Sequence, residues 1–499
     1  MADWLFLPLD GRPCNARFPV ELAALAGQAL ASPPTEQLGN ARQSARRDRL
    51  QVWLESRLEG AQGLFLSLDT WIYGNLVASR KNREGLEQLR ARIGLLADYR
   101  ARGLAIHGFA TLLRLSNSND DTEERPYWAL HGQQIYRYSW LEHYLRENQD
   151  AELEAEFASL EAAIPIEALA DYRQLRARNF AILQELLTAV EQELLQTLLI
   201  GCDDGGSHGW TVLERQHLQA EIEARGLGQH VLLYPGADEL ACTLLARVLA
   251  PQPLRLQLAW THPEANAQIT RYEGIPLAET LAHQARAAGV ELADPDETGE
   301  GLLWIHNPPG EQIDQFLDRE HRVAFAAAHT EALLAALRQN GIPVALADVV
   351  YANGGDIELL ECLERERQLF GLSAYAGWNT AGNTLGMLLA WFKLCLLRLR
   401  DPAAQQRFLV ERLADDGWYQ GWLRQQLCAH YSEPVTIDSC IQAIAFYNEK
   451  FRAWSQWMPD PPPVLQIQHL SFPWRRFFEV DLRVCTTEVA CEPRQNSQR

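Results

Sequence analysis

A short apolar segment followed by two aspartates and a glycine turn, LLIGCDDGGSHG at 198–209, constrains the fold of this chain more than any other stretch. Residues 198–201 are typical of a buried strand, and Asp203 and Asp204 follow it directly, before a helix predicted at 211–224. In α/β enzymes, ligands bind beyond the carboxyl ends of such strands, and glycines allow the backbone to approach a ligand closely. The same pattern predicts strands at 4–9, 63–68, 105–110, 230–234, 254–260, 302–305, 344–347 and 373–376.

Strands that alternate with helices predict an α/β fold, with parallel-sheet units that are either barrel-like or doubly wound and have their helices outside. A length of 499 residues suggests two or three domains. We predict an N-terminal α/β domain at 1–250 with a helical insertion near 125–195, a second α/β unit at 251–400, and a mostly helical C-terminal segment at 401–499. Whether the two α/β series share one sheet stays open at this point. Helices are expected, among other places, at 20–30, 151–193 and 322–339.

The overall charge and the cysteine pattern exclude several classes of function. With 45 basic and 65 acidic residues the net charge is −20, which disfavours nucleic acid or an anionic membrane as a partner. No apolar run reaches the roughly 18 residues of a membrane span, and the N-terminus lacks the basic start of a signal peptide. The nine cysteines are scattered without a CxxC pair. We therefore expect a reduced, cytoplasmic protein that acts on a small molecule, with an oligomeric state that the sequence leaves open.

Polar residues at the ends of the predicted strands form the candidate site. If the strands are parallel, these ends lie on one face of the molecule. Carboxylates that converge there need a cation, a proton or a polar substrate to offset their repulsion, although about half of them are expected to bind loop backbone instead. Besides Asp203 and Asp204, the candidate substrate-binding residues are Asp10, Arg12, Asp69, Asp238, Asn307, Asp348, Asn379 and Asn383.

Acid–base chemistry on a sugar is the leading hypothesis for this site. Asp203 and Asp204 are predicted to be the catalytic pair of a hydrolase that acts on a small glycoside, such as an N-acetylated amino sugar or its phosphate. In a substrate-assisted reaction, one carboxylate would orient the acetamido nitrogen and the other would protonate the leaving oxygen. Aromatic residues near the strand ends could stack on sugar rings, although packing is their more common role: Trp71, Tyr73, Trp210, Trp260 and Trp378.

Two other functions stay open. The aspartates, with His107 or His208, could bind a divalent metal for hydrolysis or lyase chemistry, but no HxH or HExxH spacing supports this, so no metal ligand is assigned. A GxGxxG fingerprint is absent, so no nucleotide cofactor is expected. We expect no cofactor, unless the site binds a divalent metal. The third hypothesis is a non-enzymatic sugar-binding or regulatory protein.

Six motifs together resemble one bacterial family, domain of unknown function 4127. The resemblance spans nearly the whole chain and implies a full-length bacterial protein whose motifs fall at the strand ends described above. It implies no catalytic assignment. Separately, an acidic pair after the fourth strand of a possible barrel is similar to substrate-assisted β-N-acetylhexosaminidases, a similarity of fold that does not fix a function. The motifs are LPLDGRPCN at 7–15, SLDTWIYGNLVASR at 67–80, CDDGGSHG at 202–209, YPGADE at 234–239, ADVVYANGGD at 347–356 and YAGWNTAGNTLG at 375–386.

Overall fold

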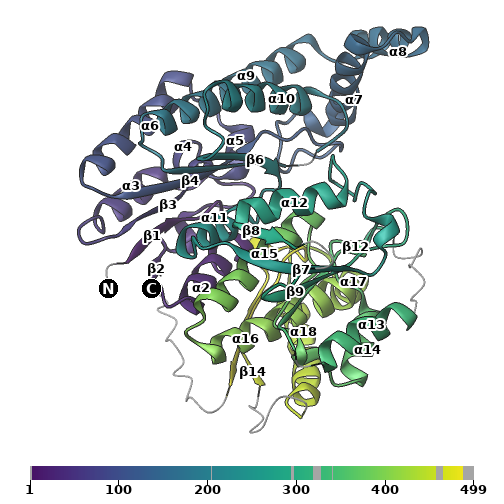
Figure 1. Ribbon diagram of the computed structural model, residues 1–499. Coiled ribbons are helices and arrows are strands. Elements are labelled where there is room, and N and C mark those ends of the chain that lie inside the picture. The colour runs from purple at the N-terminus through teal and green to yellow at the C-terminus, as the bar shows by residue number, and fades with distance from the viewer. Residues whose placement is uncertain are drawn as a thin grey trace.

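Two separate parallel sheets, one in each half of the chain, organise the fold, as a computed structural model shows (Figure 1). The structure describes residues 3–203, 205–293, 297–318, 327–339, 341–456 and 465–486. The first sheet has the strand order β2-β1-β3-β4-β5-β6, and every neighbouring pair is parallel. Its strands are β1 (Trp4–Leu7), β2 (Leu30–Ala31), β3 (Gly63–Ser67), β4 (Ala105–Leu112), β5 (Thr197–Cys202) and β6 (Val231–Pro235).

Helices cover both faces of the first sheet, which explains why its strands are almost continuously apolar. On one face, Leu64 and Leu198 belong to a buried cluster with side chains of α6 (Leu86–Ala101) and α9 (Ile166–Glu191). On the other face, alternate strand residues such as Phe65 pack with α2 (Phe18–Leu25) and α11 (Leu240–Leu249). Successive side chains of each strand therefore pack against helices on opposite faces of the sheet.

The second sheet repeats the winding of the first. Its order is β13-β11-β9-β7-β8, again parallel, so that in both sheets the first strand lies between the second and the third. A doubly wound sheet binds ligands beyond the carboxyl ends of its strands, at the point where this order reverses. The strands are β7 (Leu254–Trp260), β8 (Val290–Leu292), β9 (Gly301–His306), β11 (Val344–Asp348) and β13 (Ala374–Ala376).

One apolar helix, α15 (Ala381–Arg398), joins the two halves. It packs against α11 from the first half and α12 (Leu277–Ala288) from the second, and its side chains from Ala381 to Leu394 are buried. A helix that is apolar on all sides is the expected element at such a junction. The N-terminus of α15 thereby lies next to the carboxyl ends of the first sheet.

Two peripheral parts complete the fold. The insertion consists of α7 (Trp128–Glu147), α8 (Ala151–Ala163) and α9, and α8 forms the far tip of the molecule in Figure 1.

The C-terminal part is largely helical and returns toward both halves. It contains α16 (Pro402–Arg412), a π-helix at Leu413–Leu423, α17 (Arg424–His430) and α18 (Ile437–Trp454), followed by the antiparallel pair β14 (Leu465–Ser471) and β15 (Asp481–Thr486).

The predicted α/β class is confirmed, and the sheets are open and doubly wound, with no closed barrel among the described residues. The helix predicted at 20–30 is wrong in its second part: α2 ends at Leu25 because Gly27 adopts a left-handed conformation (φ 72°), and Leu30 begins β2. The helical run at 151–193 is two helices, separated at Pro165. Helix α13 (Ala327–Arg338) lies within the predicted 322–339, of which 322–326 lie outside the described residues. The domain boundaries stay a prediction, and no described helix could cross a membrane.

Candidate active site

A buried ion-pair network holds the carboxyl edge of the first sheet together. Arg12, which follows β1, donates to Asp10 (Nη2 to Oδ2, 2.7 Å) and to Asp238 beyond β6 (Nη2 to Oδ1, 2.6 Å; Nη1 to Oδ2, 2.9 Å). Asn15 donates to the same two carboxylates, at 3.2 and 3.0 Å. The guanidinium forks match both carboxylates, a geometry that Lys could not supply.

The second half of the chain contributes directly to this network. Asn379 Nδ2 donates to Asp238 Oδ2 (3.1 Å), and the Asn383 side-chain oxygen accepts from the backbone of Asp238 (3.2 Å). Asn379 has a left-handed backbone (φ 51°), which Asn tolerates better than most residues. Asp238 is therefore one of the residues at which the two halves contact each other directly. Burial raises the pKa of its carboxyl group and Arg12 opposes the increase.

A cleft of about 300 Å³ opens above this network, between the first sheet, the start of α15 and the C-terminal part. Asp203, at the end of β5, is one of its walls, and its side chain is 20% exposed. Among the described residues, four arginines and four carboxylates line the cleft, so their charges balance. Its lining residues are Arg12, Leu76, Val77, Arg80, Arg114, Ser118, Asp120, Thr122, Glu123, Asp203, Ala237, Asp238, Asn379, Thr380, Asn383, Trp474, Arg476 and Phe478.

Arg80 joins two of the cleft carboxylates. Its Nη2 atom donates to Asp203 Oδ2 (2.8 Å) and its Nη1 atom to Glu123 Oε2 (3.1 Å). Glu123 also accepts from Arg114 (3.2 Å) and Arg476 (3.2 Å). Burial favours the neutral form of Glu123, but the surrounding arginines outweigh it and lower the pKa to about 2. Glu123 is thus held ionised beside Asp203.

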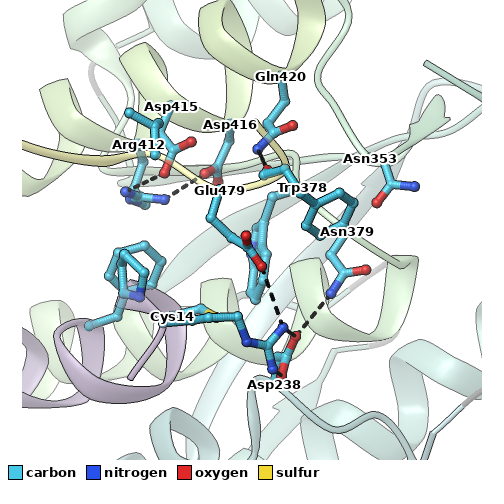
Figure 2. A pocket seen from close by; sticks show the side chains of 15 residues that line it. Cys14, Asp238, Asn353, Trp378, Asn379, Arg412, Asp415, Asp416, Gln420 and Glu479 are labelled. Atoms are coloured by element: carbon cyan, nitrogen blue, oxygen red, sulfur yellow. Dashed lines mark hydrogen bonds and ion pairs between the residues drawn. The ribbon is translucent and has the colours of Figure 1, made fainter. Parts of the chain in front are cut away.

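A smaller chamber of about 40 Å³ lies next to the network and shares Arg12, Asp238, Asn379 and Phe478 with the cleft (Figure 2). The π-helix forms the opposite wall of the chamber. Its residues Asp416 and Asp415 accept hydrogen bonds from Arg412, the last residue of α16, at 2.6 and 3.0 Å. Burial raises the pKa of Asp416 to about 7, against the effect of Arg412. π-helices are rare and frequent at functional sites, but this chamber has room for little more than water.

Several residues that the sequence predicts for substrate binding are occupied by internal contacts. Asp69 is 2% exposed and accepts from the backbone (2.9 Å) and hydroxyl (3.1 Å) of Thr111, and burial raises its pKa to about 7. Asp10 is 1% exposed. Neither residue lines the cleft. Asn307 accepts from and donates to the backbone of His262, which closes a loop after β7.

Asp348 belongs to a separate buried network at the carboxyl edge of the second sheet. It accepts from the Asp356 backbone (2.7 Å) and the Tyr375 hydroxyl (3.1 Å), and Asp356 contacts His306 Nε2 (3.1 Å). Burial is the main cause that raises the pKa of Asp348 to about 6. None of these four residues lines the cleft or the smaller chamber.

Five of the predicted site residues therefore line one cleft: Arg12, Asp203, Asp238, Asn379 and Asn383. Asp204 lies outside the described residues. The aromatic residues considered for sugar stacking do not line the cleft, and Trp71, Tyr73 and Trp210 are buried. Among the described residues, no group of three or more His, Cys, Asp or Glu side chains is placed to hold a metal ion.

Sequence reasoning missed the cleft residues that come from irregular segments. Glu123 is in the polar loop after β4, and Trp474, Arg476 and Phe478 are in the loop between β14 and β15. The acidic and basic composition of these loops is the only local signal that could have identified them.

The chain is similar to several solved structures, all at low identity. A GH1 β-glucosidase from Exiguobacterium antarcticum B7 is 9% identical, with 67% of this chain and 77% of that chain covered and a TM-score of 0.18. A bacterial fucosidase with a bound inhibitor is 10% identical, with 79% and 70% covered and a TM-score of 0.16. An α-L-fucosidase GH29 from Bacteroides thetaiotaomicron is 9% identical, with 83% and 73% covered and a TM-score of 0.16. TM-scores of this size carry no argument about this chain.

No curated protein sequence matches the chain. One family model does, over residues 4–483, which includes all six motifs and both sheets. The chain therefore belongs to the family described as "Protein of unknown function (DUF4127)".

Proposed function

We propose that the protein is a hydrolase that acts on a small, neutral glycoside bound in the cleft. The balanced charge of the cleft lining carries this proposal. A charged substrate would leave one sign of charge in excess, whereas a polyhydroxyl compound can use guanidinium donors, carboxylate acceptors and the amides of Asn379 and Asn383 at once. The partly exposed aromatic rings of Trp474 and Phe478 offer apolar surface for a sugar ring.

Asp203 and Asp204 are the acid–base pair in this proposal. Asp203 lies at the end of a rigid parallel strand, and its bond to Arg80 fixes one carboxylate oxygen while the side chain stays partly exposed to the cleft. One member of the pair protonates the leaving oxygen. The other orients the substrate's acetamido group or activates water.

Glu123 supplies a fixed negative charge next to this pair. Because its arginine neighbours hold its pKa at about 2, it stays ionised through the whole pH range of an assay. Cleavage of a glycosidic bond passes through a transition state with positive charge on the sugar ring. An ionised carboxylate that is already in place stabilises such charge without reorganisation.

Asn substitutions at the acidic pair test the proposal. Asp203→Asn and Asp204→Asn should each lower kcat for aryl glycosides by about 10²- to 10⁴-fold, because each removes a proton-transfer group. Asp98→Asn, at an exposed carboxylate on α6, is the matched control and should leave turnover unchanged. Equal activity of the wild type and both site variants would refute the assignment.

The same assay separates the two remaining functions. Turnover that a chelator abolishes and a divalent metal restores would favour a metal-dependent hydrolase or lyase. Sugar binding without turnover in any variant would favour a binding or regulatory protein.

A further inference from the structure

The loop between β14 and β15 adds two aromatic residues to a cleft whose described lining is mostly polar. Trp474 and Phe478 both line the cleft and are partly exposed. Neither ring is part of the four hydrophobic clusters found among the described residues, nor of the apolar side chains packed against them. Large apolar rings at a polar cleft therefore need an explanation other than the core.

The backbone of this loop is strained where it presents the first ring. Trp474 (φ 55°, ψ 12°) and Arg475 (φ 58°) are consecutive left-handed residues, although neither is glycine or asparagine. Such conformations cost energy and persist where the surrounding structure holds them, often at ligand sites. Here the first of the two strained residues, Trp474, is one that lines the cleft.

Charged neighbours hold the ring in this position. The guanidinium carbons of Arg12 and Arg476 lie 5.2 and 4.7 Å from the centroid of the Trp474 ring. Arg476 is itself fixed on two sides, by Glu479 in its own loop (2.6 Å) and by Glu123 across the cleft (3.2 Å). The ring is thus positioned by the same ion pairs that form the cleft.

We infer that Trp474 is a specificity-determining residue of this site, which selects ligands that present an apolar ring face, as pyranosides do, beside their hydroxyl groups. Arg476 is a positioning residue that acts through Trp474. The inference rests on the proposed function for the class of substrate, but it concerns binding and not the chemical step.

Ligand binding to Trp474 variants tests the inference. The probes are a set of methyl and 4-nitrophenyl pyranosides, with the linear polyol sorbitol as a ligand without a ring face, and binding is measured by calorimetric titration. For each pyranoside that binds the wild type, Trp474→Ala should weaken binding about tenfold or more, because it removes most of the apolar contact. Trp474→Phe should restore most of it.

Arg475→Ala is the matched control. Arg475 shares the strained backbone but is exposed and does not line the cleft, so this variant should bind like the wild type. Equal melting temperatures of the variants would show that the loop stays folded.

The outcomes distinguish this inference from the proposed hydrolase. If Trp474→Ala weakens binding but Asp203→Asn turns over normally, the role inferred for Trp474 is supported and the catalytic assignment of Asp203 is refuted. Unchanged binding in Trp474→Ala would overturn the inference whatever the kinetics. Absence of binding by every pyranoside, or equal binding of sorbitol, would overturn it as well.

Discussion

Removal of Arg12 should be the most destabilising single change at the junction of the two halves. Its side chain is 9% exposed, while its two partners, Asp10 and Asp238, are 1% and 6% exposed. Arg12→Met leaves both carboxylates buried without their cation. Breaking a buried pair in this way costs about 3–5 kcal/mol, and little of this is lost to solvent screening at such low exposure.

An exposed arginine provides the comparison. Arg90 on α6 pairs with Glu87 and Glu185, but its side chain is 39% exposed. Arg90→Met should therefore change the free energy of unfolding little, because solvent screens exposed ion pairs. The difference between their free energies of unfolding isolates the effect of burial, because each variant replaces one arginine by methionine.

The penalty of Arg12→Met should also depend on pH. Burial already raises the pKa of Asp238, and Arg12 opposes this, so the variant should raise it further. A carboxyl group whose pKa is higher in the folded state stabilises the fold below its unfolded pKa of about 4, and this stabilisation is lost as the pH rises. The defect should consequently be smaller at pH 5 than at pH 8.

Urea unfolding followed by circular dichroism and tryptophan fluorescence measures both effects. The two signals together show whether the halves unfold in one step. A free energy of unfolding for Arg12→Met within about 1 kcal/mol of the Arg90→Met value at pH 8 would refute the reasoning. So would a defect that grows as the pH falls.

Four further changes have clear expected outcomes. Burial raises the pKa of Asp69 to about 7, so wild-type stability should fall as the pH rises from about 4 to 7, and Asp69→Asn should flatten this slope in thermal melts. Arginines lower the pKa of Glu123 to about 2, so Glu123→Gln should reduce stability at pH 7 and remove the loss that the wild type shows between about pH 4 and 2. A Cβ at Gly355 would overlap the Tyr375 hydroxyl, so Gly355→Ala should destabilise by about 1–3 kcal/mol in denaturant titrations. Gly94→Ala, in a helix with open space around it, should instead stabilise by up to about 1 kcal/mol.

The sequence predicts the parts of the fold and site that depend on local pattern. Apolar runs such as 63–68 become strands because they can bury both faces in a parallel sheet. Residues that follow such strands within one to three positions, such as Asp203 and Asp238, then reach one edge of the sheet. Their common location follows from topology alone and needs no side-chain detail.

Side-chain partners that are distant in sequence decide the rest. Asp69 follows β3 as Asp203 follows β5, but Thr111 offers two donors that hold Asp69 inside. Arg476 and Glu123 are separated by 353 positions, and neither belongs to a periodic element, so no local pattern indicates that they meet. The sequence left the choice between a barrel-like and a doubly wound sheet open for a related reason, because strand order depends on the crossover connections between strands.

The late position of the β14–β15 loop has a consequence for synthesis. Both sheets, Asp203 and Glu123 have emerged and can fold before residues 472–480 leave the ribosome, since domains fold as units during translation. A chain that stops before this loop would have both sheets and these two acidic residues, but it would lack Trp474, Phe478 and one of the guanidinium groups that contact Glu123. If the cleft binds a sugar as proposed, only the finished chain would have the aromatic part of the binding site.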